Sequence, residues 1–229
     1  MRRNCVISCI FGREYAYVYP APKDIESHFF TNSRSIKNEV VAKGWKYHFL
    51  NFPLSDDVAI SSLQSKYIKF LQFKKQIKFA YFELYANIIY VDHKFKLEKQ
   101  HVAKLLGQIK RSVLIRKTPR LKDKIWDEVN DAMGQERYRR FMPQTIEYVE
   151  EKLNNGYSEH VRICNTGLIV YNIRGKLVNK LVDEVYSDLM MLGTSECQII
   201  WALITQKYAD IIQTIEWEEL PIIWEIPIK

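Results

Sequence analysis

The sequence predicts an α/β protein with a mixed, mostly parallel sheet flanked by helices, and three features carry this prediction. A short apolar run at 5–11 (CVISCIF) is followed by Gly12, as is typical of a buried strand. A second apolar run at 88–91 ends in Asp92-His93-Lys94, which is typical of a strand that surfaces at the carboxyl edge of a parallel sheet. Between them, 56–75 shows helical spacing of apolar residues after the N-cap signal Ser55-Asp56-Asp57, so strands and a helix alternate.

The other elements follow from the same two periodicities. Further strands are predicted at 28–31, 45–52, 112–115, 161–164, 168–171, 211–217 and 220–226, and further helices at 98–106, 121–132, 136–153, 176–192 and 196–206. The clearest helix is 176–192, where apolar residues form one stripe. Because no long polar linker interrupts the pattern, we predict a single domain over 1–229.

Composition and charge narrow the class of protein. Hydrophobic residues make up 47% of the 229 positions, with only 8 Gly and 7 Pro, which excludes a disordered or low-complexity chain. No run approaches the roughly 18 apolar residues that a membrane span needs, and the four cysteines form no C-x-x-C pair. We therefore expect a cytoplasmic protein with reduced cysteines. The net charge of +7 favours an anionic partner: nucleic acid, phosphates, acidic glycans or an anionic membrane face.

Short polar motifs accompany the predicted strands and helices in a particular order. In chain order they are Ser8, Thr31-Asn32, Lys66, Asp92-His93-Lys94, Asn165-Thr166-Gly167 and Ser195-Glu196-Cys197-Gln198. This order resembles that of the GT-A type glycosyltransferases, in particular glycosyltransferase family eight and the related group with a W-I-D-G-N signature. The resemblance covers about 5–208, and its motifs are short and degenerate.

The resemblance implies a role for each motif. Asp92-His93-Lys94 stands where the family has D-x-D or D-G-N, and Asn165-Thr166-Gly167 stands where it has N-S-G or N-T-G. Glu196 replaces or shifts the aspartate of the family's D-Q segment. The implied catalytic residues are Asp92, Glu196 and Gln198; the implied donor contacts are Ser8, Thr31, Asn32, Lys66, Lys94, Asn165 and Gly167; and Arg120 and Glu128 are expected to hold acceptor or donor hydroxyls.

The acidic motif departs from the family pattern at its second position. In a D-x-D segment, residues i and i+2 of an extended chain point to the same side, so two carboxylates address one metal ion and the ribose. Here Lys94 takes the second position, where an ammonium group repels a metal but can itself neutralise a diphosphate. Two alternatives stay open: either Asp92 binds manganese or magnesium with help from His93 or distant ligands, or the site works without a metal.

The resemblance therefore implies an enzyme, a retaining hexosyltransferase with a UDP-sugar as the expected donor. It implies a glycan or lipid-linked acceptor in surface polysaccharide biosynthesis, and it places acceptor-side helices and a C-terminal tail at about 120–229. The basic residues Arg137, Arg139, Arg140, Lys122 and Lys124 are candidates to hold an anionic glycan or the inner face of a membrane. Nucleic acid is not an expected partner.

Three other functions compete with this one. The pI of about 9.1 and tyrosines near basic residues favour a nucleic-acid-binding protein, although no RNP, helix-turn-helix or zinc spacing supports it. Lys94 and the segment Glu196-Cys197-Gln198 favour a catalytically degenerate GT-A-like scaffold. A nucleotidyltransferase is a third alternative, whereas a P-loop NTPase is excluded because the sequence has no G-x-x-x-x-G-K-[ST].

Overall fold

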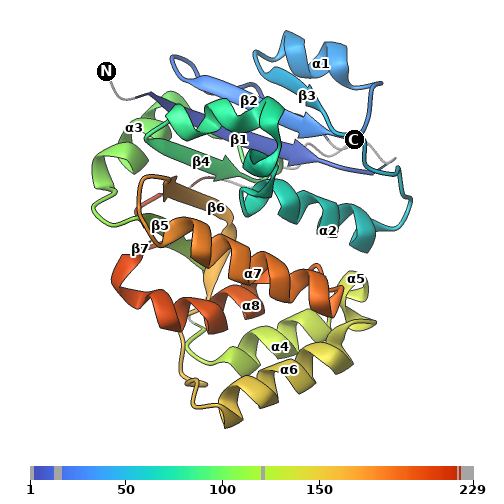
Figure 1. The fold of residues 1–229 in the computed structure, drawn as a ribbon, viewed down its shortest axis with the longest axis vertical. Helices are drawn as coiled ribbons and strands as arrows, with labels where there is room; N and C mark the ends of the chain where they lie inside the picture. Colours follow the sequence, from blue (N-terminus) through green and yellow to red (C-terminus); the bar gives the residue numbers. More distant parts are fainter. Residues whose placement is uncertain (1–2, 13–16, 120–121, 221, 223–229) are drawn as a thin grey trace.

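A central sheet organises the protein in a computed structural model that describes residues 3–12, 17–119, 122–220 and 222 (Figure 1). Within these residues the sheet has seven strands in the order β3-β2-β1-β4-β6-β5-β7. Its strands are β1 (Asn4–Ile10), β2 (Glu26–Thr31), β3 (Lys46–Phe49), β4 (Asn87–Val91), β5 (Val113–Lys117), β6 (Cys164–Asn172) and β7 (Ile212–Ile215). Four neighbouring pairs are parallel, and β6 runs antiparallel to both β4 and β5. The predicted α/β class with a mixed, mostly parallel sheet is confirmed.

Helices cover both faces of the sheet. One face packs against α1 (Lys37–Ala42) and α3 (Lys99–Gln108). The other packs against α2 (Val58–Lys69), η1 (Gln72–Lys75), η2 (Ile77–Leu84), α7 (Val178–Leu192) and α8 (Cys197–Ile204). Beyond α7 and α8 lie α4 (Ile125–Met133), α5 (Glu136–Arg139) and α6 (Met142–Asn154), and η3 (Thr205–Ile211) leads from α8 into β7 (Figure 1). Every helix among the described residues is too short or too polar to cross a bilayer.

Two apolar cores lie on opposite faces of the sheet, because successive side chains of a strand point to opposite sides. In β1, Ile7 and Cys9 belong to the core on the α2 side, whereas Val6 belongs to the core on the α1 side. In β4, Tyr90 faces the α2 side and Ile89 the α1 side. This alternation decides which strand residues can reach the cavity described below.

Several predicted elements differ from the structure. The predicted helix 56–75 is divided because Leu71 adopts a left-handed conformation (φ 56°) between α2 and η1. The predicted helix 136–153 is two helices, and Pro143, whose nitrogen cannot donate a hydrogen bond, lies in the first turn of α6. The strand predicted at 168–171 belongs to β6, whereas of the strand predicted at 161–164 only Cys164 does, and 161–163 are not a strand. Most of the strand predicted at 220–226 lies outside the described residues, and α1 and η2 were not predicted.

The segment 165–167, which interrupts the predicted strands, lies at a bulge in β6. Ile115 pairs with Ile169 across the β5–β6 ladder, but the next residue, Arg116, pairs with Asn165. The extra residues of β6 between these pairs form the bulge. Asn165, Thr166 and Gly167 at this bulge also border the cavity described below.

A chain of hydrogen bonds links two neutral histidines between β2, β3 and η2: buried His28 and half-buried His48. Tyr85 donates to Glu26, so its hydroxyl accepts from Nε2–H of His28 at 3.1 Å. The Nδ1 atom of His28 then accepts from Nε2–H of His48 at 2.9 Å. Burial, followed by the charge of His48, lowers the pKa of His28 to about 3, although Glu26 opposes this change. Burial and nearby Lys46 lower the pKa of His48 to about 4.

These histidines should make the protein less stable in mild acid. Below pH 6.5 the unfolded chain binds protons that folded His28 and His48 do not take up until about pH 3 to 4, so the free energy of unfolding falls as the pH falls. We expect a loss of about 1–2 kcal/mol per histidine between pH 6.5 and pH 5. Urea unfolding of His48→Gln over this range should show a shallower pH dependence than wild type. The matched control is exposed His160→Gln, and equal slopes for all three proteins would contradict the assignment.

Candidate functional site

A cavity of about 660 Å³ opens at the carboxyl ends of β1 and β4. Its walls come from the inner face of α2, the start of α5, the bulge of β6 and the first residues of α8. Such a position is where open α/β sheets bind ligands, and the volume suits a small-molecule ligand. The predicted site residues that line the cavity are Lys66, Asp92, His93, Lys94, Asn165, Gly167, Glu196 and Gln198.

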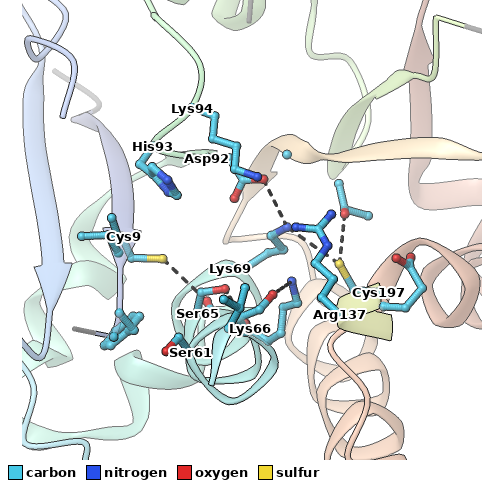
Figure 2. A pocket seen from close by; sticks show the side chains of 18 of the residues that line it. Cys9, Ser61, Ser65, Lys66, Lys69, Asp92, His93, Lys94, Arg137 and Cys197 are labelled. Atoms are coloured by element: carbon cyan, nitrogen blue, oxygen red, sulfur yellow. Dashed lines mark hydrogen bonds and ion pairs between the residues drawn. The ribbon is translucent and has the colours of Figure 1, made fainter. Parts of the chain in front are cut away.

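Two buried lysines of α2 point at the acidic end of β4 (Figure 2). Lys66 and Lys69 lie three residues apart and so occupy the same face of the helix. The Nζ atom of Lys69 is 3.7 Å from Oδ2 of Asp92, while Nζ of Lys66 donates to Oγ of Ser62 at 3.4 Å. Burial lowers the pKa of Lys66. Burial has the same effect on Lys69, but the charges of Asp92 and Cys197 outweigh it, so the pKa of Lys69 is raised. Lysines are rarely buried without a charged partner, and this face of α2 therefore favours an anionic ligand.

Asp92 is held in an ionised state at the end of β4. The Tyr90 hydroxyl donates to its Oδ1 at 2.5 Å, and its backbone N–H donates to the carbonyl of Gly167 at 2.8 Å. Burial opposes ionisation, but the ammonium groups of Lys69 and Lys66 and the Tyr90 hydrogen bond lower the pKa of Asp92 below its usual value. The carboxylate is therefore fixed and charged, with 31% of its side chain exposed to the cavity side.

Two further cations line the same cavity. Lys94 follows Asp92 by two residues, and burial lowers the pKa of its ammonium group. Arg137 reaches the cavity from α5, where its Nη2 donates to Oε1 of Gln135 at 2.9 Å and its guanidinium lies 4.4 Å from the centre of the Tyr138 ring. The sequence pattern placed Arg137 on a basic surface, whereas the structure brings it together with Lys66, Lys69 and Lys94 (Figure 2).

The start of α8 forms the wall opposite α2. Glu196 is the N-cap, and its Oε1 accepts from the backbone N–H of Gln198 at 2.6 Å. Burial, and then the neighbouring charge of Glu128, raise the pKa of Glu196. The side-chain amide of Gln198 donates to Oε1 of Glu128 at 2.5 Å. Glu128 does not line the cavity itself but holds Gln198 from behind, and it is paired in turn with Lys122 at 2.5 Å.

Three predicted donor contacts lie away from the cavity wall. Ser8 and Thr31 are buried on the sheet face that packs against α1, because they alternate with Cys9 and Phe30 on the α2 side. Asn32 accepts from the backbone N–H of Gly12 at 3.1 Å and donates to the carbonyl of Pro53 at 3.0 Å. Asn32 therefore ties together the two loops at the cavity mouth. The strand before it, β2, lies inside the sheet between β3 and β1. Arg120 lies outside the described residues.

Other residues in the cavity were missed by sequence reasoning. Ser61, Ser62 and Ser65 line it beside Lys66 and Lys69, and this polar stripe has the spacing of a helix face that the sequence itself displays. Cys197, the first residue of α8, also lines it. Its sulfur is 3.1 Å from Oγ1 of Thr166 and 3.8 Å from Nζ of Lys69. No local pattern in the sequence points to Cys197, because its position depends on how α8 packs against β6.

The residues around Asp92 do not fit a divalent metal ion. Its Oδ2 faces the ammonium group of Lys69, and Lys94 occupies the position of a second carboxylate. His93 hydrogen-bonds to the backbone of Cys9, and burial lowers its pKa to about 4. Among the described residues, no group of three His, Cys, Asp or Glu side chains converges in a way that could hold a metal ion. The side chains described around Asp92 therefore favour an anion over a divalent cation.

Gly167 has no side chain, which leaves room for the Asp92 carboxylate beside it. A Cβ atom at this position would lie 2.5 Å from Cε2 of Phe95, 2.8 Å from Oδ1 of Asn165 and 3.0 Å from Oδ2 of Asp92. Gly167→Ala should therefore displace the Asp92 carboxylate and weaken binding of an anionic ligand or its turnover by at least about tenfold, as small misplacements in active sites do. The change is measured by titration calorimetry and by turnover of the same ligand.

The matched control for this substitution is Gly107→Ala in α3. A Cβ atom there meets nothing within 4 Å, so this variant should keep full binding and gain about 0.4–1 kcal/mol in free energy of unfolding. Unchanged binding in Gly167→Ala would show that the position of Asp92 does not matter to the ligand.

Comparisons with known proteins found similar solved structures but no sequence relatives. No protein-family model matches the sequence, and no curated protein matches it. Among solved structures, mouse xyloside xylosyltransferase 1 in its apo form is similar, with 10% identity, a TM-score of 0.44, and coverage of 93% of this chain and 84% of the other. The apo structure of the bifunctional glycosyltransferase WbbM is also similar, with 12% identity and a TM-score of 0.46. The matched region covers 95% of this chain and 39% of the WbbM chain. This chain thus spans well under half of WbbM. At these identities and TM-scores, the similarity carries no argument about the function of this chain.

Proposed function

We propose that this protein is a glycosyltransferase that binds a nucleotide-diphosphosugar in the cavity at the carboxyl ends of β1 and β4. One observation carries the proposal: the ionised carboxylate of Asp92 stands at the end of a central strand and faces Lys66, Lys69 and Lys94. This combination suits a donor that has both sugar hydroxyls and a diphosphate, because a carboxylate accepts from hydroxyls and ammonium groups neutralise phosphates.

The arrangement also fits the chemistry of sugar transfer. When the bond between the anomeric carbon and the diphosphate breaks, negative charge grows on the leaving oxygen. Lys66 and Lys69 are buried and fixed, so they can stabilise that charge without reorganising at the moment of reaction. Asn165 accepts from the backbone of Gly167 at 2.8 Å, which leaves its amide N–H groups for donor hydroxyls. Glu196, whose pKa is raised by burial and Glu128, is placed to exchange a proton or a hydrogen bond across the cavity.

An adjoining hollow is the proposed acceptor side. It has a volume of about 810 Å³ and shares Val58, Gln135 and Arg137 with the first cavity, while Arg139 and Arg140 lie along its wall. This position supports the proposed assignment of the helices after about residue 120 to a glycan or lipid-linked acceptor. The family resemblance supports a UDP-sugar donor, hexosyl transfer with retention and a place in surface polysaccharide biosynthesis. It also supports a cytoplasmic location with peripheral contact at the inner membrane face.

The donor site is tested by ligand-induced stabilisation. Wild-type protein is heated with UDP, GDP, CDP, ADP and the common sugar nucleotides, and with oligonucleotides as the rival ligand. A ligand at a hundred times its Kd should raise the free energy of unfolding by about 2.7 kcal/mol. We expect a selective rise with one nucleoside diphosphate, lost in Lys66→Met and kept in the exposed control Lys180→Met. A rise with oligonucleotides alone would favour a nucleic-acid-binding protein, and no rise with any ligand would favour the degenerate scaffold.

A further inference from the structure

We infer that buried lysines of this protein, with Lys69 at their centre, take the place of the divalent cation at the diphosphate, so that the anion binds without metal. The inference rests on the proposed function for the identity of the natural ligand, but its chemistry is that of a diphosphate in this cavity. It follows from the position of Lys69 and from the balance of charges around it.

The ammonium group of Lys69 is fixed beside the acid at the end of β4. Its side chain is 3% exposed, and Nζ lies 3.7 Å from Oδ2 of Asp92 and 5.2 Å from the centre of the Tyr90 ring. The Tyr171 hydroxyl donates to the Lys69 carbonyl at 3.1 Å, which anchors the end of α2 to β6. A protein cation thus already sits against the inner oxygen of Asp92. The ammonium group therefore stands where a metal ion bridging Asp92 and a diphosphate would be needed.

A metal ion at Asp92 would be opposed by its neighbours. A dication that replaced the contact between Lys69 and Asp92 would bring like charges within about 4 Å, in a setting that water screens weakly. Lys94 adds a second positive charge two residues after Asp92, in the position where a second carboxylate would bind the ion. A diphosphate reverses this situation, because its negative charge is attracted by the ammonium groups of both Lys69 and Lys94 that line the cavity.

The charges in the cavity wall leave a surplus for an anion. The cations that line it are Lys66, Lys69, Lys94 and Arg137, and the carboxylates that line it are Asp56, Asp92 and Glu196. Glu196 is the weakest counter-charge of the three because burial and Glu128 favour its neutral form. Burial lowers the pKa of Lys66 and Lys94, which is the sign of ammonium groups that a nearby anion would stabilise. With Glu196 neutral, four cations face two carboxylates, and this surplus of two positive charges favours a diphosphate in the cavity.

The experiment uses inorganic diphosphate and metal ions as separate probes in titration calorimetry. Diphosphate should bind to wild-type protein in excess EDTA, and manganese chloride or magnesium chloride alone should not bind stoichiometrically. Lys69→Met should weaken diphosphate binding at least tenfold, whereas Lys180→Met should bind as wild type. Because Lys69→Met leaves Asp92 without its partner, Lys66→Met serves as a second variant, with the same expected loss and an intact Lys69–Asp92 pair.

Lys94→Asp combined with Lys69→Met supplies the complementary variant, since it removes the cation beside Asp92 and adds a carboxylate two residues after it. We expect this variant to bind manganese, and its affinity for diphosphate to rise when manganese is added. Stoichiometric manganese binding to wild type that disappears in Asp92→Asn would overturn the inference, as would diphosphate binding that requires magnesium or is absent altogether. Metal-free diphosphate binding without binding of any sugar nucleotide would instead refute the proposed function and leave this inference standing.

Discussion

Asp92→Asn is expected to reduce sugar transfer by at least about a hundredfold, the scale seen when a fixed charge is removed from an active site. The carboxylate lies at the end of β4 in contact with Tyr90 and Lys69, and no other carboxylate occupies the donor-facing end of this strand in the described residues. An amide keeps the shape of the side chain but loses its negative charge. The donor hydroxyls therefore lose their charged acceptor and keep at most a neutral amide oxygen.

The same substitution should separate binding from turnover. Removal of Asp92 leaves the Lys69 ammonium group available to the diphosphate, so affinity for nucleoside diphosphate should be kept or increased while kcat falls. Unfolding in urea should stay cooperative with some loss of stability, because Lys69, whose side chain is 3% exposed, loses its charged partner. Exposed Asp210→Asn is the matched control for both measurements. Full transfer activity in Asp92→Asn would remove Asp92 from the mechanism.

Lys122→Met is expected to lower the free energy of unfolding by about 3 kcal/mol, the range found when one partner of a buried ion pair is removed. Glu128 is 2% exposed, and its carboxylate accepts from Lys122 at 2.5 Å and from Gln198 at 2.5 Å. Without Lys122, this buried carboxylate keeps its hydrogen bond from the amide of Gln198 but loses its counter-charge, and it still lies near Glu196. The pair joins α4 to the wall formed by α8, so the loss should also loosen the cavity.

Urea unfolding measures this loss against Lys124→Met, an exposed lysine of the same segment that should change stability by less than about 0.5 kcal/mol. The double variant Lys122→Met with Glu128→Gln should recover part of the stability, because it removes the unpaired charge as well. Equal stability of Lys122→Met and Lys124→Met would show that Glu128 does not need its partner. In that case Glu128 could not be described as a fixed support for Gln198.

The acidic strand end could be predicted from the sequence, but the basic cluster around it could not. The apolar run 88–91 stops at Asp92, so the acidic strand end was found locally, but Lys94 lies in the turn that follows β4 and not on an extended segment as expected. Arg137 joins them only because α5 packs on α2, a contact between segments about seventy residues apart. Lys69 was visible as a helix lysine, but its pairing with Asp92 depends on the angle at which α2 crosses the strand end.

Strand alternation also explains where the predicted donor contacts failed to reach the cavity. Ser8 and Thr31 lie one residue away from positions on the α2 side, and that difference turns each side chain to the opposite face. Sequence periodicity identified the strands but did not say which face the ligand would use. Glu128 shows the converse case: it was proposed to touch substrate, and the contact between α4 and α8 makes it a support for Gln198.

The most direct test of the proposed donor site is the release of nucleoside diphosphate from a panel of sugar nucleotides, measured in EDTA with wild-type protein and with Asp92→Asn. The account predicts that wild type consumes one of these donors, by transfer or by slow hydrolysis, and that the variant does not. No release from any sugar nucleotide, together with steeply salt-dependent binding of oligonucleotides, would contradict it and identify the basic cavity as part of a nucleic-acid interface.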